Sequence, residues 1–129
     1  MGYAFAVMES DREYGAELDP DARAERIDEL SERLGTLVGH IHAGMHHYLE
    51  IVAELDRLEA WEWAGHRTPA HWLSHETGFD LGTCREHVRV ARALEELPVT
   101  SEAMSRGELS FSKVRALTRA ATPETEEDL

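Results

Sequence analysis

The stretch of sequence that decides the fold covers residues 71–121, HWLSHETGFDLGTCREHVRVARALEELPVTSEAMSRGELSFSKVRALTRAA. Residues that start or stop helices divide it into four short helices. Thr68 followed by Pro69 is typical of an N-cap with proline in the first helical turn. Gly78 is typical of a left-handed helix end, and Asp80 and Ser110 predict the N-caps of two later helices. The pattern predicts an all-α fold.

Proline and glycine set the remaining boundaries. Pro98 is expected to end the second helix, and Thr100 to cap a short third helix that ends at Gly107. The pair Thr122 and Pro123 repeats the cap-plus-proline signature, so a fifth helix is expected to begin there. Residues 65–129 are therefore predicted to form a bundle of short helices with helix-turn-helix-like corners, truncated at its C-terminal end.

The residues before this bundle show a different pattern. Residues 19–64 are predicted to form a long acidic arm, either one helix or a helical hairpin broken near Gly35 or Gly39. Its apolar residues recur at alternating steps of three and four, which is a heptad seam with only Gly44 off type. The seam consists of Ile27, Leu30, Leu34, Leu37, Ile41, Tyr48, Ile51, Leu55 and Leu58. Such a seam predicts either packing on the helices that follow or a coiled coil between two copies of the chain, a homodimer. Charge dominates residues 1–18, which are predicted to be poorly ordered.

The charge of the chain limits its function. Its 26 acidic and 13 basic residues give a formal net charge of -13, which argues against a protein whose whole surface binds nucleic acid. The charge is uneven, because residues 1–60 hold 14 acidic and 5 basic residues whereas residues 65–121 hold 7 and 8. The sequence contains no membrane-spanning apolar run and no signal-peptide pattern, so a cytoplasmic location and no membrane partner are expected.

The histidines invite a metal-site interpretation, since the chain contains 8 of them. His71 and His75, like His42 and His46, are four residues apart and would share a helix face. No third ligand stands at a diagnostic spacing, however, and surface or packing roles are the simpler interpretation. Cys84, the only cysteine, is expected to be a small core residue. The sequence therefore predicts no catalytic residue, metal site or cofactor.

Nucleic-acid recognition is the remaining candidate function. A helix, a short turn with glycine and a second helix form the outline of a helix-turn-helix, whose second helix would enter the major groove of double-stranded DNA. The candidate contact residues are Thr83, Arg85, Arg89 and Arg92 on that helix, with Lys113, Arg115 and Arg119 further along the chain. The alternative is an ordinary bundle whose arginines pair with Glu86, Glu95, Glu96 and Glu102.

Two runs carry a family resemblance. AGHRTPAHWLSHETGFDLGTCREHVRVARALEELP and GELSFSKVRALTRAATPETEEDL, which cover most of residues 64–129, resemble the domain of unknown function 222 family, the 13E12 repeat proteins usually described as HNH endonuclease-like. The resemblance implies a helical domain that precedes an HNH nuclease module, in which paired histidines and an asparagine surround a divalent metal. The chain contains no asparagine and one cysteine, so no nuclease residue carries over. The expected function is that of a non-catalytic N-terminal helical domain, which positions a nuclease through DNA contact or through self-association.

Overall fold

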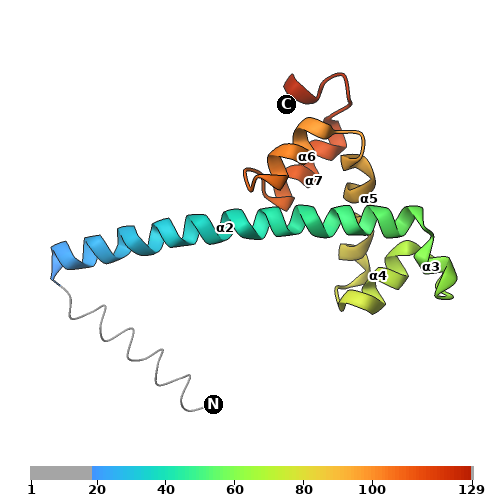
Figure 1. Cartoon of the computed structure of the whole chain (residues 1–129), viewed down its shortest axis with the longest axis horizontal. Helices are drawn as coiled ribbons and strands as arrows, with labels where there is room; N and C mark the ends of the chain where they lie inside the picture. The colour runs from blue at the N-terminus through green and yellow to red at the C-terminus, as the bar shows by residue number, and fades with distance from the viewer. Residues whose placement is uncertain (1–18, 129) are drawn as a thin grey trace, which may run out of the picture. The chain divides into compact units, whose positions relative to one another are not determined.

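The computed structural model describes residues 19–128, and these residues form helices without any strand (Figure 1). The all-α prediction is confirmed. The prediction for residues 1–18 lies outside the described residues. The helices are α2 (Pro20–Arg57), α3 (Ala60–Trp63), α4 (Pro69–Thr77), α5 (Leu81–Leu94), α6 (Pro98–Ser105) and α7 (Phe111–Ala120), followed by the 3-10 turn η1 (Glu126–Asp128). None of them is long and apolar enough to cross a membrane.

The acidic arm is one helix rather than a hairpin. Helix α2 has 38 residues, about 57 Å at the usual rise, and it continues without a break through Gly35 and Gly39. Its first turn is capped by Asp19, which accepts a hydrogen bond of 2.8 Å from the amide of Ala22. The chain divides into two compact units, Met1–Leu37 and Val38–Leu129. The division therefore falls within α2 rather than after residue 64.

Helix α5 supplies the centre of the hydrophobic core in the second unit. Five of its side chains are buried in the cluster, and Cys84 and Val90 have no exposed surface. Burying a large aliphatic side chain contributes roughly 1.5–3 kcal/mol, so this face of α5 organises the unit. The buried cluster comprises Leu49, Val52 and Ala53 of α2, Ala70 and Leu73 of α4, Cys84, Val88, Val90, Ala91 and Leu94 of α5, Met104 of α6 and Val114 of α7.

Three of the predicted N-caps are confirmed by hydrogen bonds. The Thr68 hydroxyl accepts from the amide of His71 at 3.2 Å, with Pro69 in the first helical turn of α4. The Asp80 carboxylate and the Ser110 hydroxyl cap α5 and α7 in the same way. These short polar side chains satisfy amides that a helix leaves without partners in its first turn.

Two other predicted boundaries are wrong. Helix α6 begins at Pro98 rather than after Thr100, because a first-turn proline needs no amide partner. The amides of Val99 and Thr100 donate to the carboxylate of Glu126 at 3.1 and 2.7 Å, so the cap comes from a distant part of the chain. The predicted fifth helix is instead a turn at 123–125 followed by η1. There the amide of Thr122 donates to the hydroxyl of Thr125 at 2.9 Å, a local bond that competes with helix formation.

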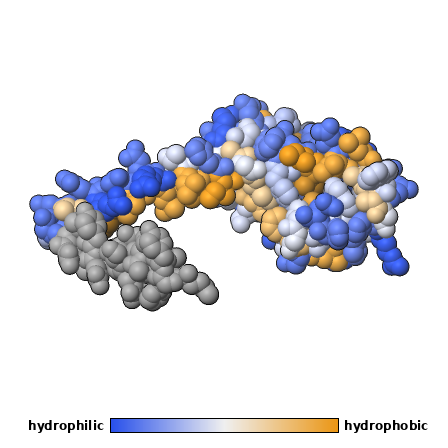
Figure 2. Space-filling view, turned by 60° about the horizontal axis from the view of Figure 1, so that its bottom comes forward, coloured by the Kyte–Doolittle hydropathy of each residue, from blue (hydrophilic) through white to orange (hydrophobic). Residues whose placement is uncertain are grey.

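The heptad seam does not pack as one continuous face. In the first unit its four large side chains are between 44 and 61% exposed; they are Ile27, Leu30, Leu34 and Leu37. The described residues of their own unit do not cover these four side chains. Further along, Ile41, Ile51 and Leu58 are exposed as well, whereas Tyr48 and Leu55 are half-buried. Figure 2 shows hydrophobic atoms exposed along the middle of α2.

Candidate nucleic-acid interface

The seven predicted contact residues lie on two helices that pack on each other. Thr83, Arg85, Arg89 and Arg92 belong to α5, and Lys113, Arg115 and Arg119 belong to α7. Six of the seven are basic, and Glu86 is the only acidic residue within these two helices. Helix α5 turns its apolar residues toward the core, so its basic residues occupy the side that is left.

Three of these arginines converge on one carboxylate, and we call the four residues the Glu86 cluster. Arg89 donates from Nε to Glu86 Oε2 at 2.6 Å, within α5. From α7, Arg115 Nε donates to Glu86 Oε1 at 3.1 Å and Arg119 Nη2 donates to the same oxygen at 2.6 Å. Arg89 also donates to the hydroxyl of Thr118 at 3.2 Å. The guanidinium groups are therefore held in place by hydrogen bonds from both helices.

The cluster carries more positive than negative charge. Hydrogen bonds from Arg89, then Arg119 and Arg115, lower the pKa of Glu86 to about 2, so its carboxylate is ionised at neutral pH. Arginine is always charged under these conditions. Three guanidinium groups face one carboxylate, so the four residues of the cluster together carry two net positive charges.

Two of the predicted contact residues form hydrogen bonds with acidic residues outside the Glu86 cluster. Arg92 makes a bidentate pair with Asp56 of α2, with hydrogen bonds of 2.6 and 2.8 Å, and this bonding raises the pKa of Arg92. Thr83 takes part in the cap of α5, since its amide and its hydroxyl both donate to Asp80. The Arg92 guanidinium and the Thr83 hydroxyl are therefore bonded within the protein, and the predicted DNA contacts would require these bonds to break.

Arg85 and Lys113 are exposed, and no ion pair joins either of them to another residue between 19 and 127. Arg85, Arg89 and Arg92 line a hollow of about 370 Å³ together with the first turn of α4. A second hollow, of about 200 Å³, is lined by Glu86 itself together with Arg115, Thr83, Gly82 and Phe111. Several basic residues of α5 and α7 therefore border these two hollows.

The alternative interpretation, an ordinary bundle with paired arginines, holds in part. Glu86 does pair with the candidate arginines, but Glu95 pairs with Arg57 of α2 and Glu102 pairs with Arg106. Those two glutamates are therefore not used by the basic residues of α5 and α7. Ion pairing with Glu86 fixes where the arginines of the Glu86 cluster lie, and the cluster keeps its excess positive charge.

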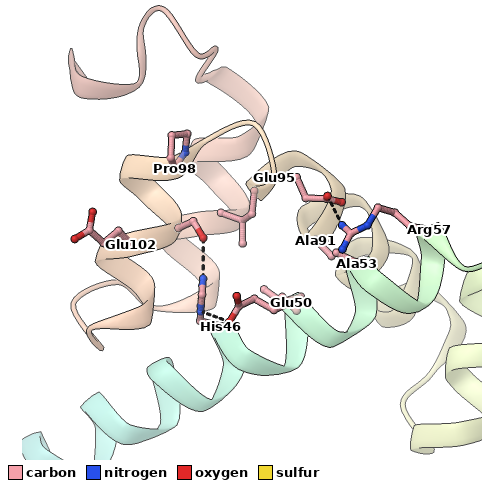
Figure 3. Close-up of a pocket in the computed structure, with 11 residues that line it drawn as sticks. His46, Glu50, Ala53, Arg57, Ala91, Glu95, Pro98 and Glu102 are labelled. Atoms are coloured by element: carbon pink, nitrogen blue, oxygen red, sulfur yellow. Dashed lines mark hydrogen bonds and ion pairs between the residues drawn. The ribbon is translucent and has the colours of Figure 1, made fainter.

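A third hollow, of about 380 Å³, holds an arrangement that the sequence did not predict (Figure 3). The buried ring of His46 lies 2.7 Å from the Ser101 hydroxyl through Nε2 and 3.3 Å from the Glu50 carboxylate through Nδ1. Serine, histidine and carboxylate in this order can activate the serine as a nucleophile, and acyl transfer also needs hydrogen-bond donors that stabilise the oxyanion of the intermediate. The amides of Val99 and Thr100 at the start of α6 are instead bonded to Glu126. The contact satisfies a buried imidazole and ties α2 to α6, 55 residues apart.

The paired histidines do not gather further ligands. In the part of the chain that the structure describes, no group of three or more histidine, cysteine or acidic side chains could hold a metal ion. His71 Nδ1 lies 2.6 Å from the hydroxyl of Thr68, and His75 Nδ1 lies 3.6 Å from the carboxylate of Glu76. His46 makes the Ser101 contact described above. These partners account for three of the histidines that the spacing singled out.

Comparison with known proteins finds no match to this chain. No protein family model, no curated protein and no solved structure matches the chain. The interpretation of the site therefore depends on its geometry and charge.

Proposed function

We propose that the chain is a non-catalytic helical module that contacts the phosphate backbone of double-stranded DNA through the basic surface of α5 and α7. The observation that carries this proposal is the Glu86 cluster, in which three guanidinium groups share one carboxylate. Arginine recognises phosphate oxygens through the same planar, bidentate geometry with which it binds carboxylates. A phosphate group can therefore use the donors that Glu86 does not occupy.

The geometry favours backbone contact over sequence readout. Phosphate contacts position a protein on duplex DNA, whereas contacts to base edges specify the sequence. The side chains at the start of α5 that would meet base edges are committed to its cap, apart from Arg85. We therefore expect weak dependence on sequence and an affinity in the usual range for non-specific complexes, roughly 10⁻⁴–10⁻⁶ M at physiological salt.

The family resemblance gives this contact a purpose. A helical domain that binds the DNA backbone without reading bases would hold an HNH nuclease module near its substrate in the cytoplasm and leave the choice of site to that module. No cofactor is needed for such a role. The proposal assigns no catalytic chemistry to this chain.

The test is binding of the whole chain to a labelled random-sequence duplex, measured by fluorescence anisotropy across a salt series. If Arg115 and Arg119 each contact a phosphate, the double variant R115A/R119A should bind more weakly. Its plot of log affinity against log salt should be shallower by about 2 than that of the unmodified chain. Circular dichroism on the same samples shows whether both proteins remain folded.

Arg106→Ala provides a matched control. Arg106 is also an exposed arginine in an ion-pair network, but its partners Glu102 and Glu108 outnumber it. Its removal changes the net charge by one unit without touching the basic surface, and binding should change little. An equal loss in R106A, or no binding by the unmodified chain at low salt, contradicts the proposal.

A further inference from the structure

The first unit presents an apolar stripe along α2, which consists of Ile27, Leu30, Leu34 and Leu37. All four side chains are exposed over about half of their surface or more. Single exposed apolar residues are ordinary on a protein surface, whereas a contiguous row of them marks an interaction site. We infer that this stripe binds the same stripe of a second copy of the chain, as a parallel two-stranded coiled coil.

The residue types in the stripe favour a second copy as the occupant. The spacing assigns Ile27 and Leu34 to heptad position a, and Leu30 and Leu37 to position d. Ile41, exposed in the second unit, stands at the next a position of the sequence. Leucine fills both d positions, and isoleucine fills two of the three a positions, with Leu34 at the third. Isoleucine at a with leucine at d favours parallel dimers, in which each side chain fits between four residues of the facing helix.

The charged residues of this segment also suit pairing between identical chains. Between residues 25 and 37 the acidic residues stand at the outer heptad positions b, c and f; they are Glu25, Asp28, Glu29 and Glu32. Two strongly acidic chains can therefore approach along the stripe without bringing carboxylates together. Arg26 and Glu29 form an ion pair of 3.2 Å on each chain, away from the a and d positions.

The positions that flank the stripe select the direction. Arg26 and Arg33 stand at position g, and the e positions hold the uncharged Ser31 and Val38. In a parallel pair each g residue faces an e residue of the partner, so each arginine faces an uncharged side chain. In an antiparallel pair g faces g, and arginines from the two chains would meet. The parallel arrangement avoids this repulsion.

Sedimentation velocity and light scattering over a dilution series of the whole chain test the association. The mass should shift from dimer to monomer on dilution, and Leu34→Asp or Leu37→Asp should raise the dissociation constant at least about tenfold, because a symmetric interface holds each substitution twice. Trp63→Asp is the matched control, since Trp63 is a large apolar side chain that is 91% exposed outside the stripe. A chain that is monomeric at every concentration, or a dimer that L34D and L37D leave unchanged, overturns the inference.

Cysteine crosslinking tests the direction. Cys84 has no exposed surface and so provides a silent background. With Leu30→Cys, a parallel pair brings the two introduced thiols together, and mild oxidation should yield a covalent dimer. Glu32→Cys, at the outward position f, should yield none. Equal crosslinking of both variants, or none with L30C in a protein that sediments as a dimer, overturns the parallel arrangement.

Discussion

At the scale of single residues, Gly107 lets the turn after α6 lie close to the backbone of α2. Its φ of 80° lies in the left-handed region, and a Cβ atom there would lie 2.5 Å from the carbonyl oxygen of Gly39 in α2. Gly107→Ala should therefore destabilise the fold by about 2 kcal/mol or more, from backbone strain together with a steric clash. Urea unfolding, followed by circular dichroism, measures the loss.

Gly65→Ala separates the two contributions. Gly65 has a similar φ of 84°, but a Cβ atom there would meet nothing within 4 Å. Gly65→Ala should lower the free energy of unfolding by only about 1–2 kcal/mol, the cost of backbone strain alone. Equal losses of stability in G65A and G107A would show that the close approach of Gly107 to Gly39 does not affect stability. The sequence predicted Gly107 as a helix end because glycine tolerates this φ. It could not predict the contact, since nothing in the local pattern connects positions 39 and 107.

At the scale of elements, helix α6 depends on a carboxylate that comes from η1. Glu126 is buried and accepts hydrogen bonds from the amides of Val99 and Thr100. Burial alone would raise the pKa of Glu126, but these hydrogen bonds, with Thr100 first, hold it below its usual value. Glu126→Ala should destabilise the fold by about 1–2 kcal/mol, as the loss of a helix cap does. Thermal unfolding measures this loss of stability, with Glu127→Ala, at an exposed neighbouring residue, as the control. An equal loss of stability in E126A and E127A would argue against a capping role for Glu126.

This contact also shows where prediction from the sequence stops. Thr68, Asp80 and Ser110 cap their helices through side chains that precede them by a residue, so local pattern was sufficient for α4, α5 and α7. The cap of α6 comes from 26 residues away, whereas the local pattern predicts Thr100, the nearest residue of a suitable type. Local rules predict those helix ends whose hydrogen bonds are local.

At the scale of the whole molecule, the sequence predicted the fold class and the helices of residues 65–121 but not which face of α2 is covered. A heptad seam is equally compatible with packing inside one chain and with pairing between chains. Tyr48 lies 2.9 Å from Nδ1 of His87, and that ring packs edge-on against Phe79 and Phe111. This aromatic cluster draws one part of the seam onto α5. The basic residues of α5 and α7 were predicted from spacing, whereas their convergence on Glu86 depends on how the two helices pack.

The Glu86 cluster joins α5 to α7 and should make the stability of the fold sensitive to acid. The pKa of Glu86 is about 2 in the folded chain, below the ordinary value of about 4.3 that applies when the chain is unfolded. Its contribution to stability is therefore present above about pH 4.3 and is lost as the pH falls toward 2. Glu86→Gln should unfold at a lower temperature than the unmodified chain at pH 7, and the difference should shrink as the pH approaches 2. Melting curves from pH 7 to pH 2 test this, with Glu127→Gln as the control for an exposed carboxylate that makes no ion pair among the described residues. If the difference in melting temperature between E86Q and the unmodified chain stays constant with pH, the charge of Glu86 does not hold the three arginines in place. The arrangement of the basic surface would then need another cause.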